Sequence, residues 1–74
     1  MLVNLDEYRT RRLMTVDEFV KHLGITLSTY YKIRRGERVR VTTMRNVAHK
    51  LGVTPYKIDE FKPFVEPENE GANN

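Results

Sequence analysis

Apolar residues recur at intervals of three and four along most of this chain, which is the spacing of one face of a helix. Between residues 16 and 23 the apolar positions are Val16, Phe19, Val20 and Leu23, and the positions between them are polar. No segment alternates between apolar and polar residues as a half-buried strand does. The pattern predicts an all-α fold of five helices, at residues 2–13, 16–23, 27–35 and 41–51 and from 55 to about 61.

The ends of several predicted helices carry their own signals. Thr15 and Glu18 fit the capping box, in which a threonine and a glutamate three residues later satisfy backbone N–H groups at a helix start. Gly24 and Gly52 each follow an apolar stripe, where a glycine in the left-handed conformation ends a helix. Pro55 stands at the first position of the last helix, where a proline is tolerated.

Charge is unevenly distributed along the chain. All 13 Lys and Arg residues lie in residues 1–65, together with seven acids, whereas residues 66–74 contain three glutamates and no base. We expect one folded, basic domain over residues 1–65 and a disordered acidic tail over residues 66–74, which is polar and without periodicity. A basic domain suits a polyanion such as DNA. An ordinary solubilising surface explains the net charge equally well.

Composition narrows the classes of protein further. The 74 residues include no cysteine, so no disulfide or thiolate metal site is expected and a reducing, cytoplasmic location fits. The longest apolar runs are two or three residues, so neither a signal peptide nor a membrane span is expected. His22 and His49 lie on different predicted helices, and no phosphate loop or nucleophile motif is present. We expect no metal, no cofactor and no enzymatic activity.

Two short sequences carry a resemblance to a known family. Leu23-Gly24-Ile25 joins the second and third predicted helices, and Leu51-Gly52-Val53-Thr54-Pro55 joins the fourth and fifth. With Val47-Ala48 and the segment from Thr15 to Gly36, they make the chain similar to the XRE family of helix-turn-helix proteins, which includes phage Cro and the lambda-repressor-like domains. The resemblance implies a compact five-helix DNA-binding domain whose second and third helices form the helix-turn-helix. It also implies a sequence-specific regulator of transcription that binds double-stranded DNA, with repression as the expected mode.

In such a domain the third helix lies in the DNA major groove and reads base edges. Tyr30 and Ile33 are expected to face the core, which leaves the other side of that helix to DNA. The residues predicted to contact bases are Leu27, Ser28, Tyr31 and Lys32. The alternative roles are a solvated charge for Lys32 and a hydrogen bond to the local backbone for Ser28. Leu27 and Tyr31 would then cover the apolar rim of the domain.

Contacts to DNA phosphates are expected beside this helix. They would come from the start of the second helix and from the basic segment that follows the third. The residues predicted to bind phosphate are Thr15, Arg35, Arg38 and Arg40. A solvated loop is the alternative interpretation of the segment that contains Arg38 and Arg40, and Arg45 and Lys50 are expected to be ordinary exposed charges.

Two departures from the family pattern concern the third helix. Arg34 stands where the family commonly has a glutamate, which often pairs with a first-helix arginine matched here by Arg9. These two cations would repel each other unless an acid such as Glu18 or Glu37 lies between them. Tyr30 replaces a smaller aliphatic residue, so its ring needs extra room and its hydroxyl needs a partner.

A homodimer on a pseudo-palindromic site is expected, because one small domain reads few base pairs. The residues predicted to form the dimer contact are Tyr56, Phe61, Phe64 and Val65. As an alternative, Phe64 and Val65 fold back onto their own core. The second functional hypothesis is a protein-interaction module, such as an antitoxin or anti-repressor partner, that uses the same fold mainly to bind protein. The acidic C-terminal tail supports this alternative.

Overall fold

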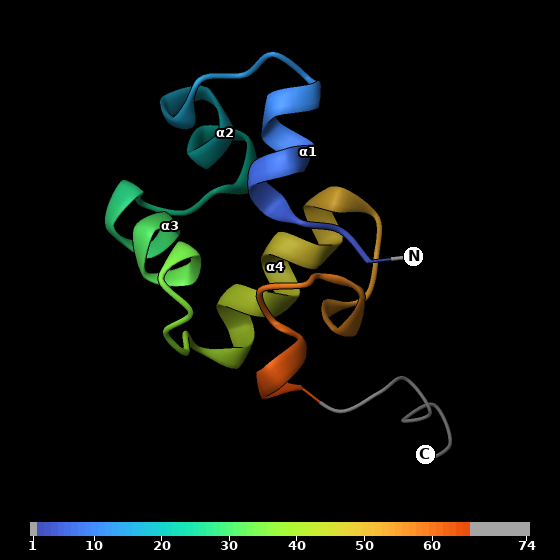
Figure 1. Ribbon diagram of the computed structural model, residues 1–74. Helices are drawn as coiled ribbons and strands as arrows, with labels where there is room; N and C mark the ends of the chain where they lie inside the picture. The colour runs from blue at the N-terminus through green and yellow to red at the C-terminus, as the bar shows by residue number, and fades with distance from the viewer. Residues whose placement is uncertain (1, 66–74) are drawn as a thin grey trace.

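The computed structural model describes residues 2–65, which form an all-helical fold (Figure 1). Its elements in chain order are α1 (Leu5–Arg11), α2 (Val16–Leu23), α3 (Leu27–Arg34), α4 (Val41–Leu51) and the 3-10 turns η1 (Pro55–Lys57) and η2 (Lys62–Phe64). The all-α prediction is therefore confirmed. No helix within residues 2–65 combines the length and the apolar character that crossing a membrane requires.

The predicted fifth helix does not form, and the described chain has four α-helices and two short turns in its place. Ile58 is extended, with φ −95° and ψ 120°, and pairs in parallel with Val3. The Val3 N–H donates to the Lys57 carbonyl at 2.7 Å, and the Val3 carbonyl accepts from the Asp59 N–H at 2.7 Å. The first helix consequently begins at Leu5 rather than at residue 2, because the preceding residues pair with the C-terminal segment.

The predicted start of α2 is confirmed by its hydrogen bonds. The Glu18 N–H donates to the Thr15 hydroxyl oxygen at 3.1 Å, and the Thr15 N–H donates to the Glu18 carboxylate at 2.9 Å, which completes the capping box. Thr26 caps α3 by accepting from the Thr29 N–H at 3.1 Å. These local contacts fix where the two helices of the helix-turn-helix begin.

All four α-helices end in the same pair of backbone hydrogen bonds around one residue in the left-handed conformation. That residue is a glycine after α2, α3 and α4, with φ of 74°, 82° and 73°. After α1 it is Leu13, with φ 58°, and its side chain is 91% exposed. A side chain costs energy in this conformation, so Leu13 is strained and gains no packing inside the domain.

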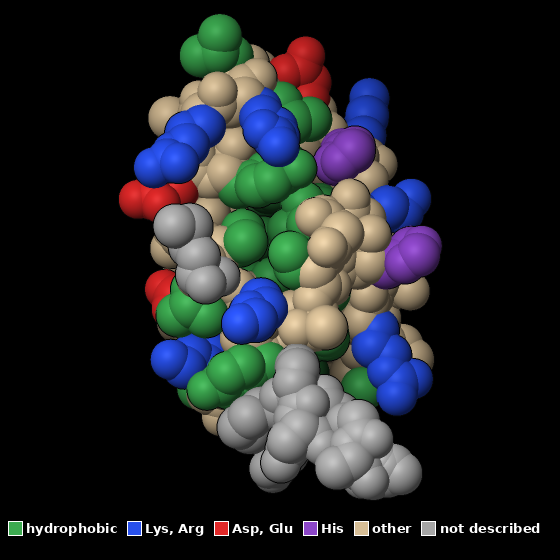
Figure 2. Space-filling model, turned by 90° about the vertical axis from the view of Figure 1, so that its right-hand side faces the viewer, with side chains coloured by type: hydrophobic (Ala, Val, Ile, Leu, Met, Phe, Trp, Pro, Cys, Tyr) green, Lys and Arg blue, Asp and Glu red, His purple; other side chains and the backbone are tan. Residues whose placement is uncertain are grey.

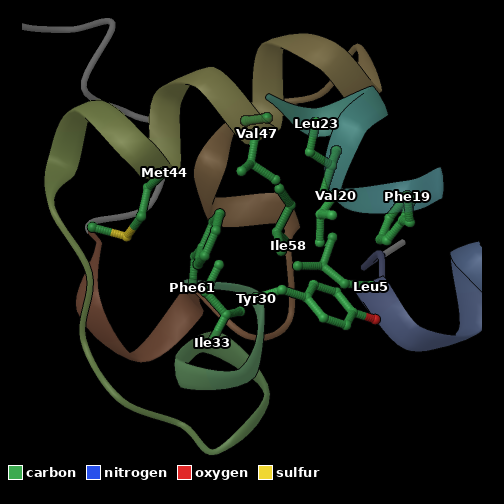
Figure 3. Packing of buried hydrophobic residues seen from close by; sticks show 11 residues of the cluster. Leu5, Phe19, Val20, Leu23, Tyr30, Ile33, Met44, Val47, Ile58 and Phe61 are labelled. Carbon is green, nitrogen blue, oxygen red and sulfur yellow. The ribbon is translucent and has the colours of Figure 1, made fainter. Parts of the chain in front are cut away.

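The core gathers apolar side chains from every α-helix and from the C-terminal segment (Figure 3). Its members are Leu5, Phe19, Val20, Leu23, Tyr30, Ile33, Met44, Val47, Ala48, Ile58 and Phe61. Phe19 stacks on Tyr8 and meets the edge of Tyr30, with ring centroids 5.9 and 5.7 Å away. Because Tyr30 and Ile33 are both buried, α3 is fixed with its opposite side turned to solvent.

The Tyr30 hydroxyl finds its partner on α1, toward which its oxygen points in Figure 3. It donates to the Asp6 carboxylate at 3.2 Å, and Arg9 donates to the same oxygen at 3.1 Å. The Arg34 guanidinium lies 3.9 Å from that carboxylate. The hydrogen bond from Arg9, followed by the charge of Arg34, lowers the pKa of Asp6, and burial raises the pKa of Tyr30.

Asp6 is thus the acid that lies between Arg9 and Arg34, and the expectation of Glu18 or Glu37 in this place was wrong. Glu18 is held in the capping box. Glu37 pairs with Arg35. One carboxylate therefore joins α1 to α3 and allows a tyrosine in the core.

The C-terminal segment is attached to the start of α1. Both carboxylate oxygens of Glu60 accept from the Leu5 N–H at 3.1 Å, and burial raises the pKa of this carboxyl. Phe61 is 1% exposed, and Phe64 and Val65 pack against the core. The predicted acidic tail, residues 66–74, lies outside the described residues.

Candidate nucleic-acid interface

The residues predicted to read bases come together on one side of α3. The outer face of α3 is formed by Leu27, Ser28, Tyr31 and Lys32, all of them exposed. Successive members of this set are one, three and one residues apart, which places them on one side of a helix with 3.6 residues per turn. In Figure 1 α3 lies at the left edge of the molecule.

The outer face of α3 combines apolar surface with a charge. Leu27 is 41% exposed and Tyr31 is 39% exposed, and both are among the few large apolar side chains that residues 2–65 leave in solvent. Lys32 lies between them and the loop that follows α3. Apolar groups that can pack on thymine methyls and a cation that can donate to guanine suit the edges of base pairs in the major groove.

A hollow of about 630 Å³ adjoins the outer face of α3. We call it the basic hollow, and its lining residues are Thr29, Lys32, Arg38, Val39, Arg40 and Thr43. It lies between α3, the loop after α3 and the start of α4. Three cations and two hydroxyl groups converge there, and no carboxylate belongs to the lining. This arrangement is suited to an anion such as a phosphate group.

Thr29, Thr43 and the start of α4 were not among the functional residues expected from the sequence. Arg40 occupies the N-cap of α4 without any side-chain cap, and no acid stands in the first turn of that helix. The N–H groups there keep their partial positive charge, which adds to the field of the three cations. The sequence did contain a signal for this anion-binding surface. The helix from residue 41 starts without Ser, Thr, Asp or Asn at its cap and follows several arginines.

Two of the predicted phosphate-binding residues already have partners. The Arg35 Nε lies 2.8 Å from the Glu37 carboxylate, and this contact lowers the pKa of Glu37. The Thr15 hydroxyl oxygen accepts from the Glu18 N–H, so only its hydrogen remains for donation to a phosphate. Arg38 and Arg40 line the basic hollow with no carboxylate partner among the described residues.

The residues predicted for a dimer contact are placed differently from expectation. Phe61 lies in the core of its own domain and offers no surface to a second copy. Phe64 and Val65 are half-buried against the same core, as the alternative interpretation had it. Tyr56 is half-buried, and the Lys62 ammonium lies 5.7 Å from the centre of its ring. The surface available from this set is smaller than the sequence suggested.

Metal ligands do not converge within residues 2–65, where no three His, Asp or Glu side chains form a group. His22 and His49 are both exposed.

Comparison with known proteins identifies the family of this chain. The model of the helix-turn-helix family matches residues 5–58, from the start of α1 to Ile58, so the chain belongs to this family. The resemblance to XRE-type regulators is thereby confirmed. The chain is also 27% identical, over 79 aligned positions, to an uncharacterized HTH-type transcriptional regulator of Bacillus subtilis (strain 168), YozG, and the match covers 97% of this chain and 94% of YozG. No solved structure gives a significant match.

Proposed function

We propose that this protein is a sequence-specific DNA-binding regulator that places α3 in the major groove of double-stranded DNA. The observation that carries the proposal is the position of the outer face of α3 directly beside the basic hollow. A reading surface and an anion-binding surface then meet one duplex at the same time. Family membership and the likeness to a transcriptional regulator support the same conclusion.

The outer face of α3 supplies the contacts that distinguish sequences. Lys32 donates to the O6 and N7 atoms of a guanine, and Ser28 donates to or accepts from a base edge. Leu27 and the ring edge of Tyr31 pack on thymine methyl groups. The buried side chains of Tyr30 and Ile33 hold the helix at a fixed depth, so these four residues keep their register on the DNA.

The basic hollow receives the DNA backbone. Arg38 and Arg40 bind phosphate oxygens together with the hydroxyl groups of Thr29 and Thr43. Thr15 at the start of α2 and Arg35 at the end of α3 bind flanking phosphates, with Arg35 first leaving Glu37. Each phosphate neutralised in this way releases condensed counterions, which makes the affinity dependent on salt.

Two copies bind one pseudo-palindromic site and repress by occupying it. One module of this size reads few base pairs, and a second copy doubles the sequence read, with α3 helices about 34 Å apart. Of the residues predicted for this contact, Phe61 is buried, and the contact is left to the half-buried Tyr56, Phe64 and Val65.

The experiment is selection of binding sites from randomised duplexes near physiological salt, with wild-type protein and with Lys32→Ala. Lys50→Ala serves as the control, because it removes the same charge from the far end of α4. We expect wild type and Lys50→Ala to enrich the same palindrome and Lys32→Ala to lose preference at one position in each half-site. Retention of DNA without an enriched motif would contradict sequence reading, and no retention would favour a protein-interaction module.

A further inference from the structure

The Leu13 side chain is apolar but is not packed inside the domain. It is 91% exposed and lies in the left-handed conformation that glycine adopts at the ends of α2, α3 and α4. Strain of this kind persists where something else holds or uses the residue. The turn places Leu13 at the tip of the loop between α1 and α2, directly after the basic end of α1.

A second hollow, of about 210 Å³, runs along the exposed side of α1. The apolar side chains that line this α1 hollow are Leu2, Val3 and Tyr8, and the charged ones are Glu7, Arg11 and Arg12. The Arg12 guanidinium lies 4.1 Å from the centre of the Tyr8 ring. Figure 2 looks onto the side of the molecule that carries the N-terminus and shows a band of hydrophobic side chains with Lys and Arg along its edges.

We propose that a second copy of this chain docks in the α1 hollow, with the two α1 helices antiparallel and the Leu13 of each copy in the hollow of the other. A two-fold interface must be self-complementary. Two charges that line the α1 hollow meet this requirement, because Glu7 lies in the first turn of α1 and Arg11 in its last turn. Antiparallel helices bring Glu7 of one copy within one helical turn of Arg11 of the other, twice in each pair.

The positions of the apolar groups obey the same symmetry. A two-fold axis near Tyr8 exchanges the two ends of α1. It therefore carries Leu13, which follows the helix, to the level of Val3, which precedes it. At that level the α1 hollow is lined by Leu2 and Val3. The same axis thus matches an exposed leucine with an apolar recess and an acidic turn with a basic turn.

This pairing differs from the one that reads a palindrome. In Figure 1 α3 lies on the left of the molecule, and α1 and the N-terminus lie on the right. Two copies joined through α1 hold their α3 helices on opposite outer sides, where they cannot enter one straight duplex. Such a pair holds two DNA segments together, a consequence that rests on the proposed function. A stable interface buries about 800 Å² per partner, more than seven helical residues supply, so the association is weak and depends on concentration.

The decisive test is a charge exchange measured by sedimentation equilibrium on protein alone. When two copies of Glu7→Arg pair, positions 7 and 11 both carry a positive charge, and when two copies of Arg11→Glu pair, both carry a negative charge. Each variant alone is therefore expected to associate less than wild type. Mixing the two variants restores both opposite-charge contacts, and the mixture is expected to associate at least as strongly as wild type. Lys50→Glu is the control for a change of charge elsewhere.

Leu13→Gly provides a second variant that keeps the fold, because glycine suits the backbone at this position. We expect it to remain monomeric at concentrations where wild type pairs. A wild type that stays monomeric at millimolar concentration, or variants that associate no more strongly mixed than alone, would overturn the proposal. Bridging is measured separately, by co-sedimentation of two differently labelled duplexes. We expect Leu13→Gly to lose bridging while binding each duplex as wild type does. A loss of binding to single duplexes would instead count against the proposed function.

Discussion

Replacing Arg38 and Arg40 by alanine removes two of the three cations of the basic hollow and leaves the helices and the core untouched. Each cation that neutralises a phosphate contributes about 0.9 to the slope of log K against log salt concentration. The slope of the double variant is therefore expected to be shallower by about 1.8. Between about 0.1 and 0.4 M salt, the ratio of wild-type to variant affinity then narrows about 12-fold.

The assay is fluorescence anisotropy with a selected duplex, titrated at four salt concentrations. Lys50→Ala is the matched control for loss of charge, and its slope is expected to equal that of wild type. Far-ultraviolet circular dichroism confirms that each variant keeps its helices. A double variant that weakens binding by the same factor at every salt concentration would contradict phosphate binding, because Arg38 and Arg40 would then act through something else.

Three further predictions concern the fold. Leu13→Gly removes a side chain from a left-handed backbone, which gains about 1–2 kcal/mol, but it also makes the unfolded chain more flexible, which costs about 0.4–1 kcal/mol. The midpoint temperature of thermal unfolding is therefore expected to rise by a few degrees, whereas Gly24→Ala lowers it. A lower midpoint temperature for Leu13→Gly would contradict the strain. Asp6→Asn costs stability at neutral pH. Because the folded state lowers the pKa of Asp6, its contribution is present above the ordinary carboxyl pKa and is lost as the pH falls through the lowered value; urea unfolding must therefore show the difference from wild type shrinking below about pH 4. Phe61→Ala empties a buried site and costs about 3–5 kcal/mol in denaturant unfolding, well above the loss for Phe64→Ala; equal losses would argue against the burial of Phe61.

The features that the sequence predicted well are local ones. The capping box of Thr15 and Glu18 and the glycine after α2 depend on residues three or four positions apart, so their chemistry is legible in the chain itself. The outer face of α3 followed from the helical period once Tyr30 and Ile33 were assigned to the core. Each of these predictions needed only the geometry of one helix and its ends.

The features that the sequence did not predict depend on segments distant in the chain. Residues 55–61 carry helical spacing, yet Val3 takes up the backbone groups on both sides of Ile58 and holds it extended. The acid between Arg9 and Arg34 is Asp6, which required knowing how α1 lies against α3. The basic hollow likewise forms only when the loop after α3 meets the start of α4.

The conformation and exposure of Leu13, after the end of α1, were not predicted for a different reason. A left-handed residue is usually announced by glycine, and Leu13 carries no such signal. Only its φ of 58° and its 91% exposure distinguish it from an ordinary apolar residue at a helix end. The surface of α1 that this leucine adjoins was consequently absent from the functional residues expected from the sequence.

We infer that DNA meets the outer face of α3 and the basic hollow, and amide chemical shifts measured during titration with a selected duplex reveal where it binds. We expect large shift changes for Ser28, Lys32, Arg38 and Thr43 and small ones for Tyr8, which lines the α1 hollow. Changes centred on α1, with the amides of α3 unmoved, would contradict it.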